Sequence, residues 1–267
     1  MGDKILLSDK GRIAVLALNR PNKGNCIDMD MLNELGDAIL RLKRNQSKVV
    51  ILTGAGKAFS TGADIDIISS IRKEKDSVVS GRQLETYLLK VHDVFMELEE
   101  LKMPVIAAIN GPCYGGGLEL ALTCDIRISS LNATFALPEV SIGLIPGAGG
   151  TYRLPNIIGE ARAKEIIYTG RYGGIPSWKA WYMGLVNKIA WNPLKAAEDM
   201  AERMSKNSYN AIVESKSAIA GRRDYRKPCE REMEAFVACF RHKDSSEGVN
   251  AFKEKRQPNF DKNIDCV

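Results

Sequence analysis

Short apolar runs alternate with helical repeats along the first two thirds of the chain. Residues 13–18, 49–53 and 105–109 are continuous apolar runs of strand length, and residues 126–128 form a shorter one. Runs of this kind are typical of strands that are buried on both faces. Between them, residues 31–42 and 84–101 carry apolar side chains at a spacing of three and four, and residues 118–122 have the composition of a short helix. The alternation predicts an α/β protein with a mainly parallel sheet.

The pattern becomes helical throughout from about residue 196 and stays so to residue 256. Neither a Ser/Gly linker nor a low-complexity tract separates this part from the rest. We therefore place a domain boundary at 195, between a core of residues 1–195 and a helical region of residues 196–267. We expect the helical region to pack on the core or on another subunit.

The composition narrows the class of protein. A hydrophobic fraction of 45% with 27% charged residues is ordinary for a globular protein. The net charge of +5 suits an anionic ligand without demanding nucleic acid. No apolar run approaches the roughly 20 residues of a membrane-spanning helix. The two histidines lie far apart in the sequence, so we expect no metal site. Six cysteines without a CxxC pair and a start that reads as strand rather than signal peptide predict a cytoplasmic protein.

Two glycine loops look like nucleotide-binding loops, but neither completes the pattern. In the loop that begins at Gly54, Ala58 stands where a phosphate loop needs Ser or Thr. In the loop that begins at Gly147, Tyr152 stands where a dinucleotide loop needs its last glycine. We expect no nucleotide site at either place.

Two further glycine turns, at residues 61–64 and 115–118, each follow a buried strand and enter a helix. The start of a helix leaves backbone N–H groups unpaired at the positive end of its dipole. Two such groups that converge on one carbonyl oxygen form an oxyanion hole. For either turn alone, the glycines equally fit a tight turn with no further role.

Several motifs occur in a fixed order around these turns: KAFSTGADI (57–65), PVIAAING (104–111), GGGLELA (115–121), FALPEV (135–140), GLIPGAGGT (143–151) and FKEKR (252–256). In this order and spacing the chain resembles the crotonase superfamily, and within it the enoyl-CoA hydratases. The resemblance implies a spiral of ββα turns followed by a C-terminal helical region. It also implies that residues 1–195 hold an acyl-CoA site and that residues 196–267 serve assembly into homotrimers or homohexamers.

The resemblance assigns the chemistry to four residues. Members of the superfamily bind acyl-CoA thioesters and stabilise an enolate, here between the backbone N–H groups of Ala63 and Gly116. Hydratases carry two glutamates, which fall on Glu119 and Glu139; the first would activate water and the second would protonate Cα. The expected activity is hydration of a 2-enoyl-CoA, with CoA as part of the substrate and no metal or redox cofactor. Taken singly, Glu119 is better explained as a solvated residue in the first turn of a helix, and Glu139 as a charged loop residue after Pro138.

The predicted CoA site departs from the superfamily pattern at one position. Many relatives carry a lysine near the CoA phosphates where this chain has Asp66. The phosphates must then be met by other cations, for which we expect Lys23 or Lys255, from the same or a neighbouring subunit. The resemblance places further CoA contacts beside the first turn, at Thr61, Asp64 and Ile65.

Some alternatives stay open. Another reaction of the superfamily, such as double-bond isomerisation, or an unusual acyl group such as an alicyclic one, also fits the motifs. The aromatic segment SWKAWY (177–182) favours core packing, or else a reshaped acyl pocket. We interpret His92 and Cys113 as packing residues. Some proteins of this fold bind RNA, and two basic clusters allow that role, although charge runs are usually solvated: Arg41, Lys43, Arg44 and Lys48, and Arg222, Arg223, Arg226 and Lys227.

Overall fold

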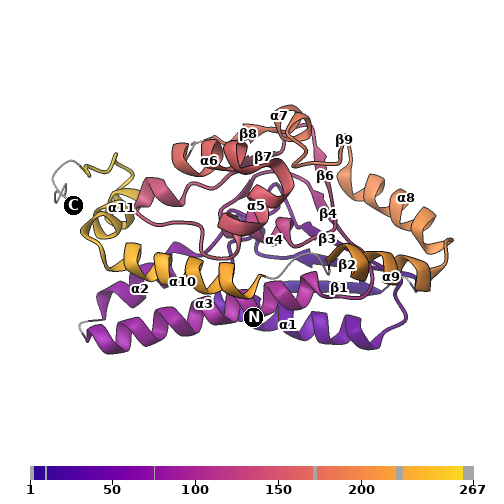
Figure 1. Ribbon diagram of the computed structural model, residues 1–267, viewed down its shortest axis with the longest axis horizontal. Helices are drawn as coiled ribbons and strands as arrows, with labels where there is room; N and C mark the ends of the chain where they lie inside the picture. The colour runs from indigo at the N-terminus through magenta and orange to yellow at the C-terminus, as the bar shows by residue number, and fades with distance from the viewer. Residues whose placement is uncertain (1–2, 10, 75, 171–172, 221–224, 261–267) are drawn as a thin grey trace.

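The computed structural model describes residues 3–9, 11–74, 76–170, 173–220 and 225–260 (Figure 1). Its strands are β1 (Ile5–Asp9), β2 (Ile13–Leu18), β3 (Val49–Gly54), β4 (Val105–Ile109), β5 (Cys113–Tyr114), β6 (Ile126–Ser130), β7 (Thr134–Ala136), β8 (Ile175–Pro176) and β9 (Lys188–Ala190). Its α-helices are α1 (Met29–Arg44), α2 (Ile65–Lys73), α3 (Ser77–Glu99), α4 (Gly116–Leu122), α5 (Gly150–Ile158), α6 (Glu160–Thr169), α7 (Ser177–Tyr182), α8 (Pro193–Ser205), α9 (Tyr209–Ala220), α10 (Arg226–Arg241) and α11 (Lys243–Glu254). Two short 3₁₀ helices are η1 (Pro21–Lys23) and η2 (Glu139–Ile142).

The larger sheet has six strands in the order β1-β2-β3-β4-β6-β9. Only the β1–β2 pair is antiparallel, and the other neighbours run parallel. The register aligns Val15 with Ile51, Ile51 with Ile106 and Ile106 with Ile126 across four strands. The predicted strands and the parallel α/β class are confirmed.

The apolar interior consists of two clusters, one on each face of the larger sheet. Successive side chains of a strand point to opposite faces of the sheet. On β3, Val50 and Leu52 belong to the main core, whereas Val49 and Ile51 join a second cluster with Ala197 and Ala201 of α8. This double burial explains why the strands are apolar without interruption.

A ββα unit repeats along the middle of the chain. β4 lies in the larger sheet, β5 lies in a second sheet of order β5-β7-β8, and α4 follows. β6 and β7 repeat this division between the two sheets, and α5 follows after η2. The predicted spiral of ββα turns is therefore present. The start of α4 lies beside β7, where Gly115 N donates to Ala136 O (2.9 Å).

The C-terminal helices pack at two different places. α8 covers one face of the large sheet, so the boundary at 195 falls inside a helix that belongs to the core packing. α10 packs against α3, and α11 packs against α2 and η2 (Figure 1). α9 has no buried residue. The division at 195 and the assembly role of residues 196–267 stay predictions.

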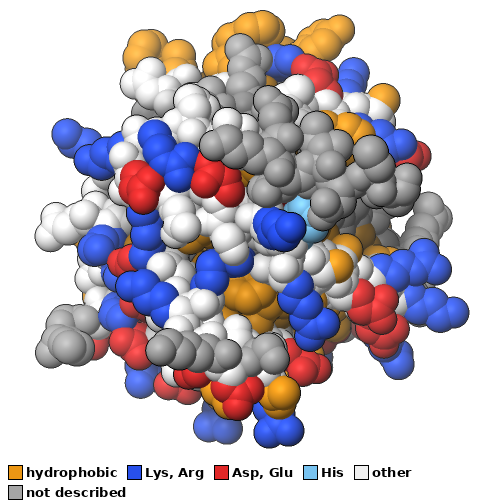
Figure 2. All heavy atoms as spheres, turned by 90° about the vertical axis from the view of Figure 1, so that its left-hand side faces the viewer, with side chains coloured by type: hydrophobic (Ala, Val, Ile, Leu, Met, Phe, Trp, Pro, Cys, Tyr) orange, Lys and Arg blue, Asp and Glu red, His pale blue; other side chains and the backbone are white. Residues whose placement is uncertain are grey.

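Two findings concern the surface. Of the helices in the described ranges, none is both long enough and apolar enough to cross a membrane. On the face shown in Figure 2, acidic and basic side chains are interspersed around a small hydrophobic area. Arg41, Lys43 and Arg44 of the first basic cluster are exposed. Arg222 and Arg223 of the second lie outside the described residues.

Candidate active site

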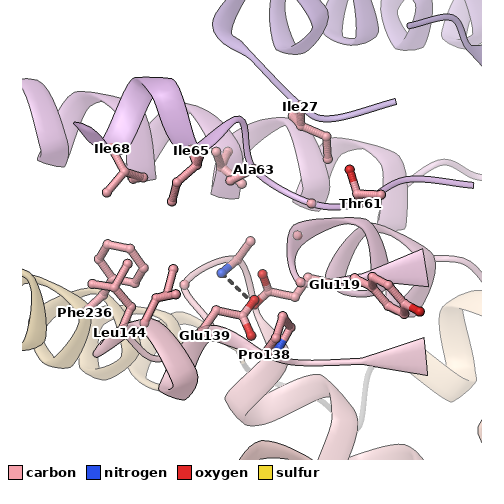
Figure 3. Close-up of a pocket in the computed structure, with 18 of the residues that line it drawn as sticks. Ile27, Thr61, Ala63, Ile65, Ile68, Glu119, Pro138, Glu139, Leu144 and Phe236 are labelled. Carbon is pink, nitrogen blue, oxygen red and sulfur yellow. Dashed lines mark hydrogen bonds between the residues drawn. The ribbon is translucent and has the colours of Figure 1, made fainter. Parts of the chain in front are cut away.

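A cavity of about 370 Å³ contains both glycine turns and both glutamates. Figure 3 shows Ile68, Leu144 and Phe236 at one end of it and Thr61 at the other, with Glu119 and Glu139 between them. The carboxyl groups of the two glutamates face each other there. The remaining lining is mostly apolar and comes from α2, α3, η2 and the C-terminal helices. A site with one apolar end and convergent polar groups in the middle is typical of a small-molecule pocket.

The two turns bring backbone N–H groups together. Ala63 forms an isolated parallel bridge with Ile27, in which Gly62 O accepts from Ile27 N (2.8 Å) and Asp64 N donates to Ile27 O (3.0 Å). This pairing uses the groups on both sides of Ala63, so the N–H of Ala63 points away from Ile27. Gly116 is the first residue of α4, where an N–H has no partner within the helix. A Cβ built on Gly116 would lie 3.5 Å from Ala63 N, so the two turns are adjacent.

Glu119 lies in the first two turns of α4 and is almost fully buried. Its Oε1 accepts hydrogen bonds from Ala148 N and Gly150 N, both at 2.8 Å. Burial raises the pKa of Glu119, while these two N–H donors and the charge of Arg153 act against the rise. The other oxygen, Oε2, has no hydrogen bond to a described residue and remains open for a water molecule.

Glu139 opens η2 directly after Pro138. Its Oε2 is buried and accepts no hydrogen bond within the described part of the chain. Burial raises the pKa of Glu139 well above its ordinary value, and the negative charge of Glu119 raises it further. Glu139 is therefore suited to hold a proton and Glu119 to lose one, which gives the pocket one acid and one base.

The sequence-predicted CoA residues are dispersed. Thr61 and Ile65 line the pocket. Lys23 ends η1 and Lys255 follows α11, both exposed and outside the lining. Their contacts with CoA stay predictions.

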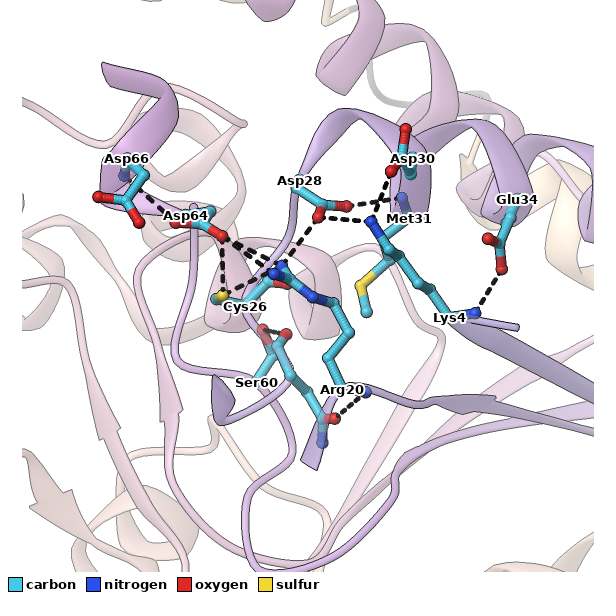
Figure 4. Close-up of polar contacts among 11 residues, drawn as sticks. Lys4, Arg20, Cys26, Asp28, Asp30, Met31, Glu34, Ser60, Asp64 and Asp66 are labelled. Carbon is cyan, nitrogen blue, oxygen red and sulfur yellow. Dashed lines mark hydrogen bonds and ion pairs between the residues drawn. The ribbon is translucent and has the colours of Figure 1, made fainter. Parts of the chain in front are cut away.

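The carboxylate of Asp64 belongs to a polar cluster behind the first turn (Figure 4). It accepts from Arg20 and from Asp66 N at 3.2 Å, and thereby caps α2. Although burial acts to raise the pKa of Asp64, the hydrogen bonds from Asp66, Cys26 and Arg20 lower it overall. Arg20 also pairs with Asp28, the cap of α1. The cluster thus fixes the turn that presents Ala63, and contact of the Asp64 side chain with CoA stays a prediction.

The interpretation of residues 177–182 was wrong in both of its forms. Trp178, Trp181 and Tyr182 are exposed, and they are neither core residues nor part of the pocket lining. Only Ser177 and Ala180 of the segment are buried, because α7 is short and presents one narrow face to β7 and β9.

Cys113 packs as expected. Its thiol is fully buried next to Gly117 O (3.5 Å), and burial raises its pKa well above the ordinary value. A protonated, inaccessible thiol is a packing group rather than a nucleophile. His92 is buried as well and lies outside the pocket lining.

Sequence reasoning missed the part of the site that the C-terminal helices supply. Phe236 of α10 and Phe252 of α11 line the cavity together with Tyr87 and Phe95 of α3. It also missed Glu232 of α10, a buried carboxylate directly behind the pocket. The available signal was spacing: Glu232, Phe236 and Phe240 recur every four residues, which places a charge on the buried stripe of a helix.

Comparison with known proteins gives consistent results across the whole chain. Residues 8–263 match the family described as Enoyl-CoA hydratase/isomerase. A protein of Clostridium acetobutylicum named short-chain-enoyl-CoA hydratase is 39% identical, with 96% of each chain covered. One of Syntrophomonas wolfei named crotonyl-CoA hydratase is 37% identical, covering 97% of this chain and 98% of that one.

Solved structures agree. The crystal structure of an enoyl-CoA hydratase/isomerase from Xanthobacter autotrophicus is 28% identical to this chain, with a TM-score of 0.85 and coverage of 95% of this chain and 94% of that one. The family match over nearly the full length, together with these two relatives, identifies the chain as a member of the enoyl-CoA hydratase/isomerase family.

Proposed function

We propose that the protein adds water across the 2,3 double bond of a short-chain 2-enoyl-CoA to give a 3-hydroxyacyl-CoA, and catalyses the reverse dehydration. The observation that carries the proposal is the meeting of two glutamates with two unpaired backbone N–H groups in one pocket. The names of the two relatives, short-chain-enoyl-CoA hydratase and crotonyl-CoA hydratase, support the same reaction.

In this mechanism the thioester oxygen accepts from the N–H groups of Ala63 and Gly116. Glu119 takes a proton from a water molecule, and the water oxygen bonds to Cβ. The electron pair of the double bond moves toward the thioester, whose oxygen carries the enolate charge between the two N–H groups. Cα then takes a proton from Glu139. One C–O and one C–H bond replace the carbon–carbon π bond and one O–H bond of water. The proton gained by Glu119 then returns to Glu139, so the cycle closes without an oxidant, a reductant or a metal.

The expected contribution of each part of the site to the rate of turnover can be stated. An oxyanion-hole donor is worth about 10²–10³-fold in turnover. A positioned acid or base contributes about 10²–10⁴-fold. The buried Glu139 and the N–H-bonded Glu119 separate the two proton-transfer roles, which a pair of solvated carboxylates would not do.

The pocket also orients the substrate. Ile68, Leu144 and Phe236 form the apolar end, where we place the acyl chain, and the CoA then leaves past Thr61. Because a cavity of about 370 Å³ must also hold the thioester, short acyl groups fit best. We place Lys23 and Lys255 near the CoA phosphates.

Assembly and location belong to the same proposal. α9 buries no residue fully: Lys216 on one face donates to Met103 O and Asp125, while the exposed side chains of the helix, Ile219 among them, are available to another subunit. A homotrimer, or a homohexamer built of two trimers, would use such a surface. We also propose a cytoplasmic location, since free thiols suit a reducing compartment.

The test follows the loss of the conjugated enoyl-thioester absorbance with crotonyl-CoA, then with a cyclic enoyl-CoA. Glu119→Gln and Glu139→Gln should each lower kcat by about 10²–10⁴-fold while KM changes little. The exposed Glu100→Gln makes the same chemical change outside the site and should leave kcat unchanged. Full activity in either pocket variant would remove that glutamate from the mechanism. A shifted double bond in the product, identified by mass and NMR, would replace hydration with isomerisation.

A further inference from the structure

Residues Gly147–Thr151, which are the last three before α5 and its first two, form the loop that holds the carboxylate of Glu119. Ala148 N and Gly150 N both donate to Oε1 of Glu119. The alternate groups of the same loop, Gly149 N and Thr151 N, donate to Glu232 at 2.6 and 2.8 Å. The Thr151 hydroxyl donates to Glu232 as well. Two carboxylates, one from α4 and one from α10, therefore accept from four consecutive N–H groups at the start of one helix.

The conformation of the loop leaves little freedom. Gly149 has φ +107°, and a side chain at this position would collide with the guanidinium of Arg153. That guanidinium donates to Ala148 O (3.0 Å) and is paired with Glu99 of α3 at 2.9 Å. Ala148 is thus fixed through its carbonyl by Arg153 and through its N–H by Glu119. Among the residues that the structure describes, Glu232 is the acceptor for the N–H groups of Gly149 and Thr151.

We infer that Glu232 is a positioning residue for the base Glu119. By holding Gly149 N and Thr151 N, it turns the interleaved N–H groups of Ala148 and Gly150 toward Oε1 of Glu119. This leaves Oε2 directed into the pocket, where the attacking water must lie. Glu232 itself does not line the pocket and touches no substrate. The inference rests on the proposed hydration reaction.

Charge gives Glu232 a second effect on the catalytic pair. Burial, followed by the charge of Glu119, raises the pKa of Glu232 to about 8. When ionised, Glu232 raises the pKa of Glu139 in turn. The titratable and charged groups that face Glu232 come from every element around it: His92 of α3 (3.8 Å), Glu119 of α4, Glu139 of η2, Tyr152 and Arg153 of α5, and Cys229 of α10.

The test compares Glu232→Gln with Glu234→Gln, an exposed position two residues further along α10. Glu232→Gln removes the charge and one acceptor oxygen at nearly constant volume. We expect kcat for crotonyl-CoA hydration to fall about 10- to 100-fold, with KM within about threefold. The basic limb of the pH profile of kcat/KM, which reports loss of the Glu139 proton, should move to lower pH, because loss of the Glu232 charge makes Glu139 easier to ionise. Glu234→Gln should change neither quantity.

A packing role alone would lower the amount of folded protein without shifting the pH profile. If Glu232→Gln does not fold, Thr151→Ala decides the question. This change removes one donor that stabilises the ionised form of Glu232, so the basic limb should move the same way by a smaller amount. An unchanged profile in the folded variant overturns the inference, as does an equal shift in Glu234→Gln. Absence of turnover in the wild-type protein instead refutes the proposed function, and the inference with it.

Discussion

Replacing Gly62 by alanine should separate the two turns that form the oxyanion hole. Gly62 has φ +97°, and a Cβ there would lie 2.9 Å from Tyr114 O and 3.1 Å from Gly116 N. Both contacts are with backbone atoms, which no side-chain rotation can relieve. The turn that carries Ala63 and the turn that carries Gly116 must therefore move apart.

The size of the effect follows from these distances. The contact with Tyr114 O must lengthen from 2.9 Å to an ordinary 3.4 Å, a shift of about half an ångström. Hole donors act within a narrow range of roughly 2.7–3.1 Å from the oxyanion, so one donor is lost or weakened. We expect kcat to fall about 10²-fold. The positive φ also costs about 1–2 kcal/mol of stability for a residue with a Cβ.

The control is Gly184→Ala, because Gly184 has φ +83° and nothing within 4 Å of the added Cβ. It carries the backbone cost without the collision. Steady-state hydration of crotonyl-CoA and thermal unfolding should be measured on both variants. We expect a similar loss of stability from the strained φ in both, and a loss of kcat in Gly62→Ala alone. If Gly62→Ala keeps the kcat of Gly184→Ala, the hole does not lie between these turns.

Two other predictions concern His92 and Phe236. Burial and the charge of Arg153 lower the pKa of His92 from 6.5 to about 4, so the unfolded chain takes up this proton at higher pH than the folded one. Stability is then lost as pH falls from 6.5 to 4. In His92→Gln, the denaturant concentration at the midpoint of unfolding should depend less on pH over this window. If its pH dependence is unchanged, other groups cause the loss of stability in acid. Phe236→Leu enlarges the apolar end of the pocket and should raise the ratio of kcat/KM for an eight-carbon over a four-carbon enoyl-CoA about three- to tenfold. A constant ratio would mean that the acyl chain lies elsewhere.

Local pattern was sufficient for much of the fold. The strands at 13–18, 49–53 and 105–109 could be predicted because they are buried on both faces, which makes their sequences apolar without interruption. The two glycine turns were recognisable since each lies between a buried strand and a helix. Glu119 and Glu139 followed only from the surrounding motifs, because a lone glutamate in a helix or loop carries no signal of its own.

The site residues that come from a helix far along the sequence could not be predicted. Glu232 lies in a charged helix, and its burial depends on N–H groups that are supplied some 80 residues earlier. Periodicity shows which face of a helix is buried, but not which partner a polar group meets there. The prediction for residues 177–182 was wrong for another reason. Aromatic composition favours burial, but no other part of the described chain covers Trp178, Trp181 and Tyr182, which are exposed.

The return of α10 and α11 to the pocket has a consequence for the order in which the protein is made. Phe236 and Phe252, which line the cavity, and Glu232, which holds the loop that donates to the base Glu119, are synthesised after all the strands of the two sheets. The strands of the large sheet emerge much earlier and can pair while synthesis continues. A nascent chain therefore has its sheet before it has a usable site, and it cannot act on a thioester until α10 and α11 have been synthesised.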